Sequence, residues 1–160
     1  MYHTRDKIRD LPAALQRISS WRIQGDLIVF SNGCFDLIHP GHIEYLEQAR
    51  QLGDRLVLGL NADVSVKKLK GEDRPINNER ARAIILAALV FVDMVIIFEE
   101  DTPQELIQAV SPDILVKGGD YIVEEIVGYE WVKKTGGKIL TIPLLEGYST
   151  TSTIKKLRDI

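Results

Sequence analysis

The sequence is poor in cysteine and has no surplus of positive charge. Cys34 is the only cysteine among 160 residues, which excludes an intrachain disulfide framework and a zinc site built from several cysteines. Lysine and arginine number 20 against 23 acidic residues, a formal net charge of -3. Nothing in the overall charge therefore indicates a nucleic-acid partner or an anionic membrane, and partners must be sought at local sites.

Long apolar segments and the common glycine-rich nucleotide motifs are also missing. No stretch approaches the roughly 18 to 20 apolar residues of a membrane-spanning helix, and residues 1–10 lack the apolar run of a signal peptide. Neither G-x-x-x-x-G-K-[ST] nor G-x-G-x-x-G occurs, so neither a P-loop ATPase nor a dinucleotide oxidoreductase is expected. We expect one cytoplasmic domain with no membrane partner, because 45% hydrophobic residues over this length can bury a single core.

Short apolar runs alternate with longer amphipathic segments along the chain. This alternation predicts parallel strands joined by helices, arranged as a doubly wound, five-stranded parallel sheet with helices on both faces. We interpret residues 1–25 as a helical prefix that packs beside the first strand, and residues 26–160 as the main domain. The strands are predicted over residues 27–31, 55–60, 92–98, 114–117 and 138–142, and the helices over 42–52, 79–90, 103–110, 123–135 and 151–158.

The loop after the first predicted strand holds two of the three histidines, His39 and His42. Imidazoles three residues apart at the start of a helix can lie on one side of it. Gly41 leaves room for a ligand, and the helix N-terminus offers free N–H groups, so we predict a phosphate site at the carboxyl edge of the sheet. A zinc site recruiting Asp36 and nucleophilic catalysis by Cys34 are weaker alternatives, because neither a third zinc ligand nor a base is identified.

The loop after the fourth predicted strand also carries residues suited to a nucleotide. Lys117 can neutralise a phosphate, and the glycine pair that begins at Gly118 lets a ligand approach the backbone. Asp120 or Tyr121 can contact the ribose or the base of a nucleotide.

The last loop, residues 147–152, contains more hydroxyl groups than one helix cap needs. The surplus predicts a second phosphate site at the start of the final helix.

A charged segment, residues 67–75, precedes the helix predicted over 79–90. We interpret it as a flexible segment whose mobile cations close over a phosphate cleft. Arg74, held beside Pro75, and Arg82, next to an apolar run, are predicted to reach the site.

Six ordered motifs resemble one family of enzymes. His39-Pro40-Gly41-His42 resembles the HxGH signature of the nucleotidyltransferase superfamily that includes the cytidylyltransferases, and Ser149-Thr150-Thr151 resembles its C-terminal S-[ST]-T signature. Over residues 26–158 the set is similar to the adenylyltransferase half of bifunctional ADP-heptose synthases, and six motifs in order are more specific than HxGH alone. The motifs are residues 32–36, 69–71, 74–77, 98–103, 116–121 and 148–151.

The resemblance implies a Rossmann-like fold and transfer of AMP from ATP to a sugar 1-phosphate, D-glycero-D-manno-heptose 1-phosphate. The products would be pyrophosphate and ADP-heptose, a heptose donor for lipopolysaccharide. It implies that His39, His42 and Lys117 are catalytic. The nucleotide-binding residues would be Cys34, Phe35, His39, Gly41, His42, Lys117, Gly118, Asp120, Tyr121, Ser149, Thr150 and Thr151, and the sugar-phosphate residues Asn32, Asp36, Lys70, Arg74 and Arg82.

The same resemblance carries expectations about cofactor, partners and alternatives. Mg²⁺ is expected to be carried by the substrate phosphates, because the sequence shows no carboxylate cage. We expect a homodimer, and a separate kinase that supplies the sugar phosphate, since no sugar-kinase half is present. Two alternatives stay open: a CTP-dependent cytidylyltransferase acting on glycerol 3-phosphate or another phosphoalcohol, and a non-catalytic nucleotide-binding domain. Cys34 stands where many cytidylyltransferases have threonine, which favours the heptose branch.

Overall fold

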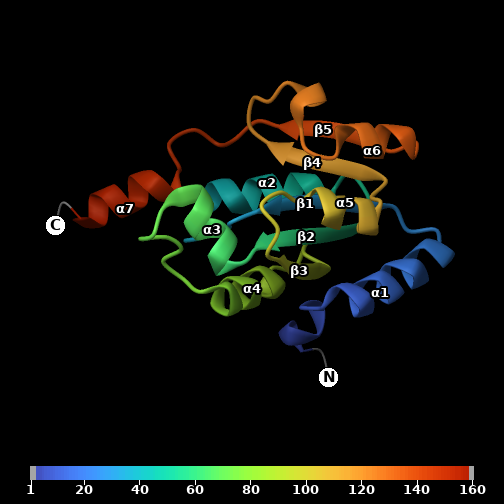
Figure 1. Cartoon of the computed structure of the whole chain (residues 1–160), viewed down its shortest axis with the longest axis horizontal. Helices are drawn as coiled ribbons and strands as arrows, with labels where there is room; N and C mark the ends of the chain where they lie inside the picture. The colour runs from blue at the N-terminus through green and yellow to red at the C-terminus, as the bar shows by residue number, and fades with distance from the viewer. Residues whose placement is uncertain (1–2, 159–160) are drawn as a thin grey trace.

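A computed structural model describes residues 3–158 and places one parallel sheet at the centre of the domain (Figure 1). The strand order is β3-β2-β1-β4-β5, so the chain leaves β1 first toward one edge of the sheet and later toward the other. This is the doubly wound, Rossmann-like α/β arrangement that the alternating pattern predicts. The strands are β1 (Ile28–Gly33), β2 (Arg55–Asn61), β3 (Met94–Phe98), β4 (Ile114–Gly118) and β5 (Lys138–Ile142).

The side chains of each central strand alternate between two hydrophobic layers. In β1, Val29 belongs to one cluster of buried residues, whereas its neighbours Ile28 and Phe30 belong to the other. In β2, Leu58 lies in the first cluster and Val57 in the second. Because both faces are buried, these strands read as continuous apolar runs rather than as polar and apolar alternation.

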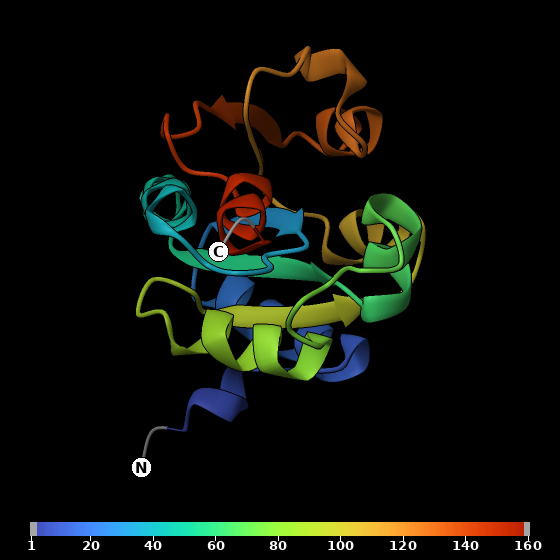
Figure 2. The same ribbon diagram turned by 90° about the vertical axis from the view of Figure 1, so that its left-hand side faces the viewer.

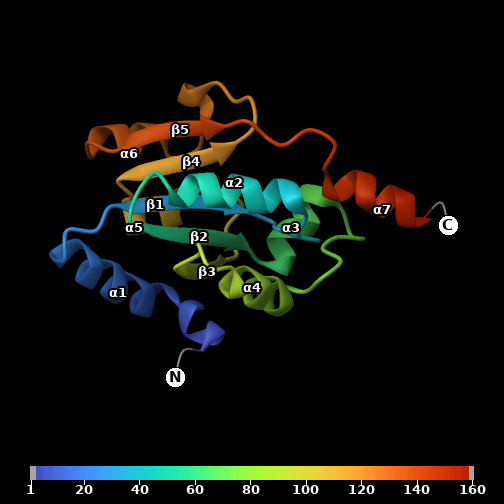
Figure 3. The ribbon, with the colours of Figure 1, turned by 180° about the vertical axis from the view of Figure 1, so that it is seen from behind.

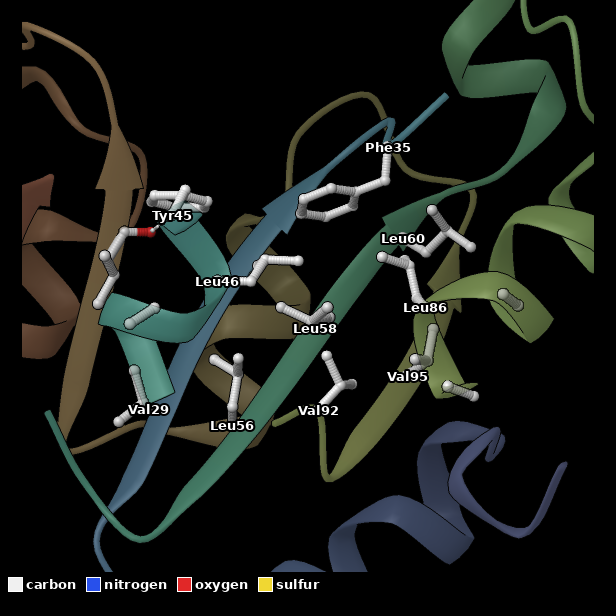
Figure 4. Packing of buried hydrophobic residues seen from close by; sticks show 14 of the residues in the cluster. Val29, Phe35, Tyr45, Leu46, Leu56, Leu58, Leu60, Leu86, Val92 and Val95 are labelled. Carbon is white, nitrogen blue, oxygen red and sulfur yellow. Dashed lines mark hydrogen bonds between the residues drawn. The ribbon is translucent and has the colours of Figure 1, made fainter. Parts of the chain in front are cut away.

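The first layer lies between the sheet and the helices α2 (Pro40–Arg50) and α4 (Glu79–Ala88). Figure 4 shows Leu46 of α2 and Leu86 of α4 on either side of the β2 leucines Leu58 and Leu60. Both leucines are fully buried, which stabilises the domain by about 2 kcal/mol each relative to exposure. This packing holds the N-terminus of α2 at the carboxyl edge of β1.

The second layer lies under α1 (Leu11–Ile23), α5 (Gln104–Val110) and α6 (Tyr129–Lys134). Helix α1 buries Ala14, Ile18 and Trp21 against this layer and contacts β3 and α5. A short 3-10 helix, η1 (Thr4–Lys7), precedes it. The predicted helical prefix is therefore α-helical from Leu11 and covers the face opposite to α2.

Two local predictions are wrong. The segment predicted as a flexible charged connection begins as a helix, α3 (Asp63–Lys70), which ends at Gly71 with a φ of 102°. The helix predicted over 123–135 is interrupted: a 3-10 turn, η2 (Val123–Glu125), is separated from α6 by Gly128, whose φ is 93°. A glycine with positive φ ends or caps a helix, so both interruptions follow from glycine conformation.

The last helix, α7 (Thr150–Arg158), differs from the other α-helices because it buries none of its residues. In Figures 1 and 3 it extends beyond the carboxyl ends of the strands, away from the rest of the domain. Within residues 3–158, no helix is both long and apolar enough to cross a membrane.

Candidate active site

A cavity of about 620 Å³ opens at the carboxyl edge of the sheet, the edge that faces the viewer in Figure 2. Six segments surround it: the loop after β1 with the start of α2, the end of β2, the end of α3 with the following loop, residues 101–103 between β3 and α5, the end of β4 with the loop after it, and the segment from β5 to α7. Doubly wound sheets bind ligands at this edge because the loops after the strands meet there.

The loop after β1 is held in an unusual backbone conformation. Phe35 and Leu37 have positive φ values of 45° and 51°, which non-glycine residues rarely adopt. Between them, the carboxylate of Asp36 accepts the backbone N–H groups of Ile76 (2.7 Å) and Asn77 (3.1 Å). The Asp36 side chain has no exposed surface, so it fixes this loop to the segment before α4.

A buried arginine completes this attachment. Arg82 of α4 donates to the carbonyl oxygens of Cys34 (2.6 Å) and Asn77 (3.0 Å) and pairs with Asp63 (2.8 Å). Its side chain is 0% exposed, so the guanidinium makes these hydrogen bonds entirely within the protein. Arg82 therefore joins three segments at the floor of the site.

The two histidines lie against each other at the start of α2. Their ring centroids are 3.9 Å apart, and the Nδ1 of His42 accepts the backbone N–H of His39 at 3.4 Å. Burial and the neighbouring His39 lower the pKa of His42 to about 4, and burial lowers the pKa of His39. Near pH 7 His42 is therefore a neutral imidazole whose proton is on Nε2, a hydrogen-bond donor and not a cation.

Gly41 is required by the position of His39. A Cβ at residue 41 would lie 3.0 Å from Cε1 and 3.1 Å from Nδ1 of the His39 ring. The Nδ1 atom is itself buried without a hydrogen-bond partner. The glycine between the histidines thus lets the His39 ring lie against the backbone of α2.

Three cations border the cavity: Lys70, Arg74 and Lys117. Arg74 donates to Asp36 at 3.2 Å and is 14% exposed, so its position is fixed. Burial, together with Lys70, lowers the pKa of Lys117. Burial raises the pKa of Cys34 despite the nearby cations, so this thiol is protonated and poorly suited to act as a nucleophile.

The segment before α7 supplies the hydroxyl groups. The Oγ of Ser149 accepts the backbone N–H of Ser152 at 3.0 Å, and Thr150 Oγ1 donates to the carbonyl oxygen of Asp36 at 2.9 Å. The ring of Tyr148 stacks on His39 with a centroid distance of 6.2 Å. These contacts bring the C-terminal segment beside the histidine pair.

This arrangement of two neutral imidazoles, three cations and a hydroxyl-rich helix start around one cavity is suited to a polyphosphate. A family model described as cytidylyltransferase-like matches residues 30–156, which include all six segments of the site. The chain belongs to the cytidylyltransferase-like family.

Other members of the cytidylyltransferase-like family are similar to nearly all of the chain. The bifunctional protein HldE of Nitrobacter hamburgensis is 58% identical over 141 residues, 88% of this chain and 29% of that protein. The HldE protein of Magnetococcus marinus is 51% identical over 156 residues, 98% of this chain and 32% of that protein. The chain thus spans about a third of the length of these curated relatives.

Two solved structures share the fold. A lipopolysaccharide core biosynthesis protein from Thermoplasma volcanium aligns with a TM-score of 0.61 and 30% identity, over 78% of this chain and 100% of that one. Pantoate-beta-alanine ligase from Francisella tularensis aligns with a TM-score of 0.56 over 96% of this chain and 78% of that one. At 16% identity, the second similarity concerns the fold alone.

Most of the predicted site residues of this cytidylyltransferase-like domain border the cavity. The structure brings together residues from loops more than 100 positions apart, although which of them bind substrate stays a prediction. The predicted residues that line the cavity are Asn32, Cys34, Phe35, Asp36, His39, Gly41, His42, Lys70, Arg74, Lys117, Gly118, Tyr121, Ser149, Thr150 and Thr151.

Three predicted contacts need correction. Arg82 is fully buried and bonded inside the protein, so it does not reach a substrate phosphate. Asp36 borders the cavity, but its buried carboxylate is used by backbone N–H groups and Arg74. Asp120 is exposed and is not among the residues that line the cavity. A polar residue within or near a motif therefore need not point into the site.

Several cavity residues were missed in the sequence, among them Asn61 and Tyr45. Asn61 is the last residue of β2, and a polar residue at the carboxyl end of a buried strand is itself a signal for this edge. Tyr45 follows His42 by one helical turn, and its hydroxyl bonds to Ser31 (2.6 Å) and the carbonyl of Val116 (3.2 Å). The apolar spacing of α2 makes Tyr45 indistinguishable from an ordinary core residue.

Proposed function

We propose that the chain transfers AMP from ATP to D-glycero-D-manno-heptose 1-phosphate, forming ADP-heptose and pyrophosphate. The observation that carries the proposal is the meeting of His39, His42, Lys117 and residues 149–151 around one cavity. The six motifs that resemble ADP-heptose synthases and the 51–58% identity to the bifunctional HldE proteins support heptose 1-phosphate as the acceptor and adenine as the base of the nucleotide. In this proposal the product is a heptose donor for lipopolysaccharide. The reaction would take place in the cytoplasm.

The reaction is an in-line displacement at the α-phosphorus of ATP. An oxygen of the sugar phosphate forms a bond to that phosphorus while the bond to the β-phosphate oxygen breaks, and pyrophosphate carries the electron pair away. The attacking phosphate is already an anion, so no general base is needed. Catalysis then consists of positioning and of stabilising charge on the transferred and leaving phosphates.

The neutral state of His42 gives it a defined part in this scheme. Because its Nδ1 accepts the His39 N–H, the Nε2–H is the donor available to an α- or β-phosphate oxygen. Lys70, Arg74 and Lys117 supply the positive charge that the imidazoles lack. The N-terminus of α7, with Ser149 and Thr150, would hold a further phosphate group.

Mg²⁺ carried by the substrate triphosphate is part of the same proposal. Among residues 3–158 no group of three or more His, Cys, Asp or Glu side chains is placed to hold a metal ion. Of the two carboxylates at the cavity, that of Asp36 is fully buried and that of Asp101 pairs with Lys68 at 2.7 Å. When bound, Mg²⁺ would neutralise phosphate charge, while this chain orients the phosphates through its own N–H groups and cations.

Pyrophosphate release from ATP and CTP, each paired with heptose 1-phosphate or glycerol 3-phosphate, tests the proposal. We expect release only with ATP and the heptose phosphate. Activity confined to CTP and glycerol 3-phosphate would replace the proposed substrate pair. Binding of nucleotide without release for any pair would replace the enzyme by a nucleotide-binding domain.

A further inference from the structure

Strands β1 and β4 separate before they reach the active site. Over the described residues 3–158, β1 pairs with β2 at six positions, up to Gly33↔Leu60, but with β4 at two, of which the last is Phe30↔Leu115. The end of β4 stays paired with β5 as far as Gly118. The chain reverses its direction across the sheet between β1 and β4, and doubly wound sheets bind ligands at this point. The width of the gap therefore sets how far apart the two sides of the site lie.

The side chain of Tyr45, on α2, bridges this gap where the strand pairing ends. Its hydroxyl donates to the carbonyl oxygen of Val116 at 3.2 Å and lies 2.6 Å from the Oγ of Ser31. Because a tyrosine hydroxyl carries one hydrogen, Ser31 is the donor in the second bond. Ser31 and Val116 directly follow the last pair, Phe30↔Leu115, so the Tyr45 hydroxyl joins the two strands where the next pair would form. Figure 4 shows Tyr45 near the carboxyl end of β4.

The bridge is a fixed part of the folded domain. Tyr45 is 6% exposed and Ser31 is fully buried. Burial raises the pKa of the Tyr45 hydroxyl to about 12, so it stays protonated and remains a donor at neutral pH. A Cβ at residue 118 would lie 3.2 Å from Cε2 of the Tyr45 ring, so Gly118 leaves room for the ring against the end of β4. The bridge thus holds both strands without any ligand.

The bridge connects two groups on opposite sides of the phosphate site. His42 precedes Tyr45 by three residues, which places both on one side of α2. Lys117 directly follows Val116, the residue that accepts the Tyr45 hydroxyl. His42, Tyr45 and Lys117 all line the cavity. A change in the bridge would therefore change the distance between the His42 imidazole and the Lys117 ammonium group.

We propose that Tyr45 is a positioning residue, whose hydroxyl sets the separation of β1 and β4 and through it the spacing of His42 and Lys117. The hydroxyl is already bonded to Ser31 and Val116, so it acts through these two groups and not on the substrate. The inference rests on the proposed function, in which both groups orient phosphates for in-line attack. A misplacement of about 1 Å in such groups can slow a reaction about 100-fold.

Tyr45→Phe tests the bridge because it keeps the ring and removes the hydroxyl. We expect kcat for pyrophosphate release to fall about 10- to 100-fold, with the KM of each substrate changed less than about twofold, because the loss concerns alignment in the transition state. Ser31→Ala removes the other end of the bridge. Added to Tyr45→Phe it should slow release no further, since the bridge is already broken.

Two controls separate positioning from stability. Tyr129→Phe removes a tyrosine hydroxyl on α6 that bonds to Lys133 at 2.7 Å, outside the cavity. Asp10→Ala removes the capping hydrogen bond of α1 (2.9 Å), on the sheet face opposite to α2. Both should keep the kcat of the unmodified chain. In crystals without substrate, the distance from His42 Nε2 to Lys117 Nζ should change by more than about 0.5 Å in Tyr45→Phe and in neither control.

A lower kcat at unchanged KM, together with the changed distance, supports the proposal. It is overturned if Tyr45→Phe keeps its kcat, if the KM of ATP rises instead, if Asp10→Ala loses as much activity, or if the distance is unchanged. A chain that releases pyrophosphate with no substrate pair would overturn the proposed function. The distance in the substrate-free crystals would still decide whether Tyr45 sets the spacing of the two groups.

Discussion

The two halves of the phosphate site are attached to the domain in opposite ways. The loop after β1 is fixed by the buried Asp36 and Arg82, which together bond to backbone groups of Cys34, Ile76 and Asn77. The C-terminal half, from Tyr148 through α7, is attached by the stacking of Tyr148 on His39, one hydroxyl hydrogen bond and one exposed ion pair. The first half is fixed by buried side chains, whereas α7 in the second half buries none of its residues.

The largest difference should appear in stability. Arg82→Met removes a buried guanidinium and leaves the carbonyl oxygens of Cys34 and Asn77 without donors, so the free energy of unfolding should fall by about 3–5 kcal/mol. Arg158→Met breaks an ion pair of similar chemistry whose side chains are 64% and 83% exposed, and should cost less than about 0.5 kcal/mol. Urea unfolding of both variants measures the contrast. Equal losses would show that the two halves are not anchored differently.

Turnover should depend strongly on the rigid half. His42→Ala removes a preorganised donor and should slow pyrophosphate release by roughly 10²–10³-fold, without a comparable loss of stability. The matched control is His3→Ala, which removes an exposed histidine in the N-terminal segment. Near-native turnover of the His42 variant would remove this residue from the mechanism.

The pH dependence of stability should also come from the rigid half. The pKa of His42 is about 4 in the folded chain, below the ordinary value of 6.5, so the unfolded chain binds more protons between these values. The stabilising contribution is therefore complete above pH 6.5 and is lost as the pH falls toward 4. Unfolding curves across this range, compared with His42→Gln, measure it; an unchanged slope in the variant would assign the effect to another group.

The smallest contrast concerns two helix caps. Asn78 caps α4 by accepting the N–H of Ala81, and Ser149 caps α7 by accepting that of Ser152, at 2.9 and 3.0 Å. Asn78→Ala should lower global stability by about 1 kcal/mol because α4 is part of the core. Ser149→Ala should instead speed amide exchange within α7 alone, as hydrogen exchange can show. Global destabilisation by the Ser149 variant would mean that α7 unfolds together with the core.

The sequence predicted the elements that carry a strong local pattern. All five strands were recognisable as apolar runs, and the HxGH loop was recognisable from its spacing. The misassigned segments were those where a helix carries little apolar character, as in α3, or where one glycine interrupts it, as at Gly128. Charge alone does not distinguish a solvated helix from a flexible loop.

Residue types and their order along the chain by themselves determined the class of fold and the edge of the sheet that holds the candidate site. Tertiary structure alone decided which charges are free to act. Arg74 and Arg82 look alike as cations near a cleft, but Arg74 borders the cavity whereas Arg82 lies entirely inside the protein. Burial and hydrogen-bond partners depend on segments that are distant in sequence, and these set the protonation of His42 and the role of each charge.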